Sequence, residues 1–177
     1  MHYCQDQSPI VVSNQKETLN DLAEDIANRV PTDSYEDPGT PAPFTRDTSL
    51  NRIVMECLPF CTATPRTDAV YILECLQNSS YRRTAVQYLH RTNKPWEGDV
   101  EEADRLIYVG MTVNLLRRID EHLNSPGDDG AHFTTVFPPV RLLDVSWWPS
   151  FDEAMRAEER IADHLQERFP SDYVYQL

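Results

Sequence analysis

The sequence predicts an α+β fold in which helices flank a small sheet of three strands, antiparallel in type, preceded by a helical extension. Three apolar runs between residues 69 and 148 have the length and the β-branched content of buried strands. Segments with apolar residues at helical spacing follow the second and the third run. The core order is therefore β-β-α-β-α, and a hydrophobic fraction of 40% is enough for a single core.

Residues 1–67 are expected to form the helical extension, and residues 68–177 the core domain. A helix is predicted over 15–30, where apolar residues recur at helical spacing before a proline. The segment "PTDSYEDPGTPAPFTRD", residues 31–47, is rich in proline and has no periodicity, so it reads as a linker or a loosely held arm. A second short helix is predicted in "TSLNRIVMECLPFC", broken by Pro59.

The strands of the core are expected in "AVYILECL" (69–76), "LIYVG" (106–110) and "VRLLDVSWW" (140–148). An insertion, residues 77–105, separates the first two. Its first half is basic and could form a helix around Tyr81, whereas its second half, "PWEGDVEEAD", is acidic.

Two helices complete the core. The first follows the second strand, and Thr112 is placed to cap it. Its core stripe consists of Leu115, Ile119 and Leu123. The second opens at the capping box "SFDE", which begins at Ser150, and is expected to end at about Phe169.

The charge balance is strongly acidic. The chain has 29 acidic and 16 basic residues, a net charge of -13, and its only lysines are Lys16 and Lys94. This composition fits an ordinary acidic protein, or adaptation to high salt as in a halophilic archaeon or its virus. Acidity argues against binding nucleic acid. At molar salt, however, the Debye length is about 3 Å, so long-range repulsion between the acidic protein and a nucleic acid is screened. A few local arginines can then decide whether nucleic acid binds.

We expect a cytoplasmic protein that does not insert into a membrane, and the sequence does not predict its oligomeric state. No apolar run approaches the ~18 residues of a membrane span, and the N-terminus lacks the features of a signal peptide. The cysteines are then thiols or metal ligands rather than disulfides. Cys57 and Cys61, with Cys4 and His2, could form a structural zinc site, although their C-x₃-C spacing is loose.

Charged residues at two places interrupt the apolar patterns. Glu158 projects from the apolar face of the last helix, where a carboxylate is costly unless it is paired or binds a metal. A buried salt bridge is the alternative. Arg118 and His122 lie four residues apart on one helical face, beside a separate Arg117–Glu121 pair. Taken alone, these four side chains would form a solvated surface.

Two tyrosines lie within the predicted strands. Tyr71 is in the first and Tyr108 in the second, and tyrosine packs well in sheets for purely structural reasons. If the strands are neighbours, the two hydroxyl groups converge near one edge of the sheet. Together with Arg118 and Glu158, they suggest a phosphodiester site, which needs a metal ligand, a cation and a group to activate water.

Three segments resemble the GIY-YIG nuclease family over about residues 68–169. "AVYIL" resembles its first motif. "YVGMTVNLLRRIDEH" matches the pattern Y-[IV]-G-x-T-x-x-L-x-x-R-x-x-x-H, and "DEAMRAEE" resembles the start of its E-A-x-x-x-E helix. The chain departs from the family at Ala69, where glycine or an aromatic residue is usual, and in the long insertion between the two tyrosines.

The resemblance implies hydrolysis of DNA phosphodiester bonds with one Mg²⁺ or Mn²⁺ ion. Glu158 would bind the metal and Arg118 would stabilise the phosphoryl transition state. Tyr71 would be a general base or orient the water, Tyr108 would position the site, and His122 would assist proton transfer or bind phosphate.

DNA contacts are predicted from five arginines: Arg82, Arg83, Arg91, Arg117 and Arg118. Two alternatives stay open. The chain could be a nucleic-acid-binding module without catalysis, or a protein-interaction domain that contacts a partner through helix 15–30. The sequence does not define the DNA substrate.

Overall fold

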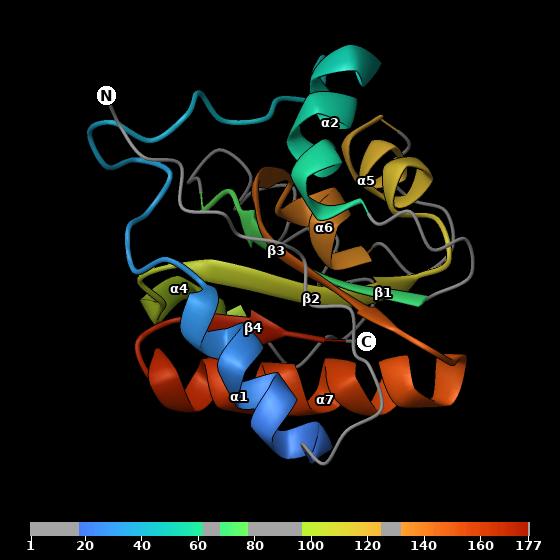
Figure 1. Ribbon diagram of the computed structural model, residues 1–177. Helices are drawn as coiled ribbons and strands as arrows, with labels where there is room; N and C mark the ends of the chain where they lie inside the picture. Colours follow the sequence, from blue (N-terminus) through green and yellow to red (C-terminus); the bar gives the residue numbers. More distant parts are fainter. Residues whose placement is uncertain (1–17, 62–67, 78–96, 125–131, 177) are drawn as a thin grey trace, which may run out of the picture.

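The structure is a computed structural model that describes residues 18–61, 68–77, 97–124 and 132–176. Its centre is a four-stranded mixed sheet (Figure 1). The strands are β1 (Asp68–Cys75), β2 (Leu106–Thr112), β3 (Pro139–Trp148) and β4 (Tyr173–Tyr175), in the order β3-β1-β2-β4. β1 is antiparallel to both β2 and β3, so the three predicted strands and their antiparallel pairing are confirmed.

The prediction of a three-stranded sheet was wrong, because β4 adds a parallel strand beside β2. It pairs from Leu106↔Tyr173 to Tyr108↔Tyr175. The segment is too short to show the alternation that marks a strand in sequence. A tertiary contact holds it instead: the buried guanidinium of Arg105 donates to Asp172 Oδ2 at 2.9 Å from Nε and 2.6 Å from Nη2. Arg105 directly precedes β2 and Asp172 directly precedes β4, so this ion pair holds the starts of the two strands together.

The helices are α1 (Leu19–Arg29), α2 (Leu50–Cys57), α4 (Glu97–Glu102), α5 (Leu115–Asn124), α6 (His132–Val136) and α7 (Phe151–Arg168), with a 3₁₀ turn at Leu58–Phe60. Those at α1, α2, α5 and α7 were predicted. The short helices α4 and α6 were not, since neither is long enough to show a helical period. Ser150 caps α7 as expected, by accepting from Glu153 N.

The cap of α5 differs from the prediction. Asn114, not Thr112, accepts a hydrogen bond from Arg117 N, at 3.1 Å. Thr112 Oγ1 instead accepts from Asn114 N at 3.0 Å and so shapes the turn that precedes the helix. A side chain two residues further from the helix cannot reach its free N–H groups.

Helices cover both faces of the sheet (Figure 1). Tyr71 and Leu73 of β1 belong to a core shared with α2, α5 and α6. Val70 and Ile72 belong to a second core, formed with α1 and α7. β1 therefore reads as a continuous apolar run because both of its faces are buried.

The proline-rich segment 31–47 is packed against the sheet rather than loosely held. Phe44 is buried, and its N–H donates to the Val140 carbonyl at 2.7 Å. The buried carboxylate of Glu74 accepts from Ser34 Oγ at 3.0 Å and from Tyr35 N at 3.1 Å. Specific polar contacts thus order a segment that prolines had already restricted.

Helix α1 packs its apolar side against the rest of the chain. Its apolar side chains Leu22, Ala23, Ile26 and Ala27 are buried in the core shared with α7. The apolar stripe of this helix is therefore not available to a partner, because an amphipathic helix buries its stripe within the same chain when a complementary face is present. A protein partner on the exposed side of helix 15–30 stays a prediction.

The basic half of the insertion, with Arg82, Arg83, Arg91 and the helix expected around Tyr81, lies outside the described residues. In the described part of the chain, no helix has the length and hydropathy needed to cross a membrane.

Candidate active site

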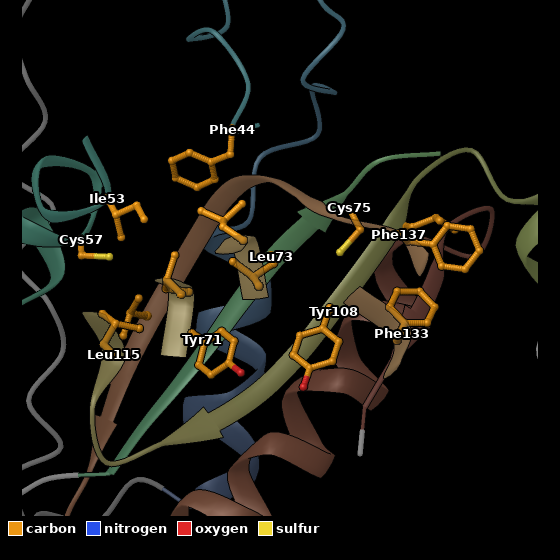
Figure 2. Close-up of a cluster of buried hydrophobic side chains, with 14 of the residues drawn as sticks. Phe44, Ile53, Cys57, Tyr71, Leu73, Cys75, Tyr108, Leu115, Phe133 and Phe137 are labelled. Atoms are coloured by element: carbon orange, nitrogen blue, oxygen red, sulfur yellow. The ribbon is translucent and has the colours of Figure 1, made fainter. Parts of the chain in front are cut away.

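Tyr71 and Tyr108 come together because β1 and β2 pair directly. Tyr71 lies opposite Gly110, which places Tyr108 two residues along the neighbouring strand. Their ring centroids are 6.0 Å apart, both side chains are fully buried, and their hydroxyl groups lie at the same side of the cluster (Figure 2). The predicted convergence of these two residues is thus confirmed.

Gly110 makes this arrangement possible. A Cβ atom at this position would lie 2.6 Å from the Tyr71 hydroxyl oxygen and 2.6 Å from Tyr108 Cε1. Real Cβ atoms almost never approach so closely, so the glycine is required for space rather than for backbone conformation. The glycine of the "YVG" motif therefore has a physical role: it leaves room for the tyrosine of the other strand.

Helix α5 contributes the Arg118 and His122 side chains to the same tyrosine. Arg118 Nε donates to the Tyr71 hydroxyl at 3.3 Å, and His122 Nε2 lies 2.7 Å from that oxygen. The other ring nitrogen of His122, Nδ1, lies 2.7 Å from Thr134 Oγ1. The i, i+4 pair therefore does share one face, but it faces inward, because Tyr71 and Thr134 supply buried hydrogen-bond partners.

The buried position of this cluster decides its protonation. Burial, with Arg118 as a second cause, lowers the pKa of His122 to about 3, so its imidazole is neutral at ordinary pH. Burial and the nearby Tyr108 raise the pKa of Tyr71 well above its ordinary value, while Arg118 acts in the opposite direction. Burial likewise raises the pKa of Tyr108 to about 12. Both phenols are protonated at rest, and the neutral His122 ring has one unprotonated nitrogen, which accepts a hydrogen bond.

The two adjacent arginines occupy different environments, as predicted. The Arg117 side chain is 76% exposed and its Nε lies 2.6 Å from Glu121 Oε1. Arg118 is largely buried at 15% exposure. The pair of Arg117 and Glu121 is not separate, however, since Glu121 Oε2 also accepts from Arg118 Nη1 at 3.2 Å. Glu121 thus bridges both arginines and helps to orient Arg118.

Glu158 approaches from the opposite face of the sheet. It lies on the buried side of α7 and is only 6% exposed, as its position in the apolar stripe predicted. It lines the same pocket as Arg118, a depression of about 530 Å³ bordered by the start of β1 and the end of β2. The negative charge of Glu158 also contributes to the raised pKa of Tyr108. Two helices on opposite faces therefore place a carboxylate and a guanidinium in one pocket.

Sequence reasoning missed two contributors to the cluster. Thr134 on α6 is buried and bonded to His122. Tyr175 on β4 stacks on Phe133 at 4.5 Å between ring centroids, and on Tyr108 at 5.9 Å. The short elements that hold them show no period in the sequence, so only their contacts reveal the roles.

Comparisons with known proteins find a family model and two relatives that are similar to part of this chain. The family model for the GIY-YIG catalytic domain matches residues 99–170 of the sequence. A UPF0213 protein of Halobacterium salinarum is 39% identical over 62 residues, which are 35% of this chain and 77% of the relative. A UPF0213 protein of Syntrophus aciditrophicus is 32% identical over 62 residues, which are 35% of this chain and 69% of that relative. No solved structure gives a significant match.

The chain belongs to the GIY-YIG family. The resemblance recognised in the sequence is confirmed, and it places the chain in a nuclease family. The matched region of the GIY-YIG domain contains Tyr108, Arg118, His122 and Glu158 but begins after Tyr71. Tyr71 is linked to that region by structure, through its pairing with Gly110 and its contacts with the α5 side chains.

The pocket of the GIY-YIG domain suits a hard divalent cation. Mg²⁺ and Mn²⁺ prefer oxygen ligands, and Mg²⁺ usually binds through one or two carboxylates, with waters and substrate phosphate completing its shell. Glu158 supplies a buried carboxylate in a pocket large enough for such ligands. Among the described residues, no three His, Cys, Asp or Glu side chains form a metal-binding group, so a closed cage is absent from that part of the chain.

The zinc prediction has no support in the described residues. Cys57 is buried and Cys61 is exposed, and both are free thiols. Burial raises the pKa of the Cys57 thiol to about 12, which disfavours the thiolate that zinc requires. The other predicted ligands, Cys4 and His2, lie outside the described residues.

Proposed function

We propose that this chain is a divalent-metal-dependent endonuclease that hydrolyses DNA phosphodiester bonds. The observation that carries the proposal is that Arg118 and Glu158, from helices on opposite faces of the sheet, line one pocket. A cation beside a metal-binding carboxylate is the arrangement that phosphoryl transfer needs, because the transition state gains negative charge on its oxygens.

Each residue of the cluster has a distinct part in this proposal. Arg118 donates to a phosphate oxygen through its guanidinium group. Tyr71 orients the attacking water and becomes a base only when bound positive charge favours its phenolate, while His122 accepts a hydrogen bond from the Tyr71 hydroxyl and holds it in place. Tyr108 packs beside Tyr71 and fixes its position. These roles fit the neutral histidine and the protonated phenols described above.

A divalent ion held by Glu158 would supply Lewis-acid stabilisation of the charge on phosphate. The high pKa of Tyr71 makes some such help necessary, since a phenol of this kind is a base only when nearby positive charge favours the phenolate. Arg118 already provides one positive charge within hydrogen-bond distance.

The test is a cleavage assay with the purified full chain, supercoiled and linear DNA, and Mg²⁺ or Mn²⁺ at several KCl concentrations. High KCl is included because the net charge is -13 and one relative comes from Halobacterium salinarum. We expect metal-dependent nicking or cutting that Glu158→Gln abolishes. Glu159→Gln, an exposed neighbour on the same helix, serves as the matched control and should cut like the wild type.

The alternative functions appear as outcomes of the same experiment. DNA binding without cleavage under either metal would favour a binding module without catalysis. Cleavage by Glu158→Gln at the rate of the wild type would remove the metal role assigned to Glu158. Replacing Arg118 by alanine should lower the rate about 10²- to 10³-fold if it stabilises the transition state.

A further inference from the structure

Exposed apolar side chains border the pocket that holds Arg118 and Glu158. Val113, Phe151 and Met155 are 79%, 58% and 50% exposed, and all three line the pocket. The described chain has six exposed large hydrophobic residues, so half of them lie at this one place. Single exposed apolar residues need no explanation, but a group of them around a reaction pocket does.

The position of these residues follows from the elements that carry the proposed catalytic groups. Phe151 and Met155 precede Glu158 on α7 at spacings of seven and three residues, which places all three along one side of the helix. Val113 lies in the turn between β2 and α5, the helix that carries Arg118. The apolar side chains therefore border the pocket both beside α5, which carries Arg118, and along α7, which carries Glu158.

A phosphodiester bound between Arg118 and Glu158 would place a neighbouring nucleoside within reach of this rim, because the three apolar side chains line the same pocket. Sugars and phosphates are polar, whereas the face of a nucleobase is flat, aromatic and apolar. Stacking a base on an aromatic side chain contributes about 1–3 kcal/mol. A base inside a duplex already has both faces covered by its neighbours, so only an unpaired, unstacked base can use Phe151.

The charge of the pocket also disfavours recognition through many backbone phosphates. The pocket is lined by the carboxylates Asp68, Glu121 and Glu158 against the guanidinium groups Arg117 and Arg118, and the whole chain is acidic. Contacts to duplex phosphates need a surplus of positive charge and weaken steeply with salt. Stacking on an apolar rim does not depend on charge and persists at high salt.

We propose that the rim formed by Val113, Phe151 and Met155 stacks an unpaired nucleobase beside the scissile phosphate. The preferred substrate is then DNA with a single-stranded nucleotide at the cleavage position, as in a flap, a bulge or a single-stranded end. This inference rests on the proposed nuclease function, and it adds the substrate class to it.

Binding is the test that separates this inference from catalysis. The probe is a flap oligonucleotide with 2-aminopurine at the first unpaired position, titrated with the full chain carrying Glu158→Gln so that cleavage does not interfere. We expect quenching of the probe by stacking. Adding Phe151→Ala should weaken binding about 5- to 150-fold, and Phe151→Trp should restore it.

Two controls define the outcome. Met55→Ala removes an equally exposed apolar side chain on α2 and should leave Kd unchanged. A fully paired oligonucleotide should bind more weakly than the flap and should not respond to Phe151→Ala. Equal affinity for flap and duplex, or no effect of Phe151→Ala, would overturn the inference even if the enzyme cuts DNA. Binding that depends on Phe151, without cleavage by the wild type, would retain the stacking of an unpaired base on this rim and would remove the proposed catalysis.

Discussion

Replacing Gly110 with alanine is the sharpest test of how the two tyrosines are held. The backbone of Gly110 does not require glycine, since the only positive φ among the described glycines is at Gly39. In a strand, Gly→Ala would ordinarily stabilise by about 0.5–1 kcal/mol, because it reduces the freedom of the unfolded chain. The new Cβ, however, would meet Tyr71 Oη and Tyr108 Cε1 at 2.6 Å each and Tyr71 Cζ at 2.8 Å.

The steric effect is expected to win. Both tyrosines are fully buried, so neither ring can swing away without disturbing its core. Overpacking of this kind costs about 1–3 kcal/mol. We therefore expect Gly110→Ala to lower the free energy of unfolding by about 1–2 kcal/mol and, by displacing Tyr71, to lower cleavage by about 100-fold.

Urea unfolding and a cleavage assay measure the two effects. The double variant Gly110→Ala, Tyr71→Phe removes one of the three close contacts, so its loss of stability should be less than the sum of the two single losses. A Gly110→Ala protein as stable and as active as the wild type would refute the reasoning, because it would show that the tyrosines do not need this space.

Three further predictions concern the groups around this cluster. Thr134→Val removes the partner of His122 Nδ1, so it should lower the free energy of unfolding by about 1–3 kcal/mol and shift the pH profile of cleavage. Thr134→Ser keeps the hydroxyl group and should leave the stability and the pH profile unchanged. Equal effects of the two variants would contradict a hydrogen-bonding role. The pKa of His122 is lowered from 6.5 to about 3, so between these values the unfolded chain binds a proton that the folded chain does not. Stability should therefore fall as the pH drops from 6.5 toward 3, by about 1.4 kcal/mol per pH unit from this residue, and urea unfolding of His122→Gln should show a shallower decline. If both proteins decline in parallel, His122 is not held neutral. Breaking the buried ion pair with Asp172→Asn should lower the free energy of unfolding by about 3–5 kcal/mol, because Arg105 would stay buried without its counter-charge. A change below 1 kcal/mol in chemical unfolding would show that the pair does not anchor β4.

Much of the architecture was predictable from local pattern. β1, β2 and β3 were recognisable because each carries a short apolar run, and α5 and α7 because their apolar residues recur at helical spacing. Glu158 stood out because a carboxylate interrupted a buried stripe. These inferences need only the periods of helix and strand, which are properties of the backbone.

Other features depended on contacts between distant segments. The pairing of Tyr71 with Gly110 spans the insertion between them, so no local pattern reports it. The packed arm at 31–47 is held by contacts with Glu74 and Val140 that its composition does not encode. Thr134 entered the cluster in the same way, through a hydrogen bond to His122.

The sequence alone therefore determined the kind of elements, the family and the chemical types available for a phosphodiester site, because side-chain type and periodicity are local. Only the tertiary structure decided that β4 completes the sheet, that His122 is buried and neutral, and that Arg118 and Glu158 line one pocket. The physical reason is that burial, protonation and convergence depend on which surfaces exclude water together, and that is set by packing between elements far apart in the chain.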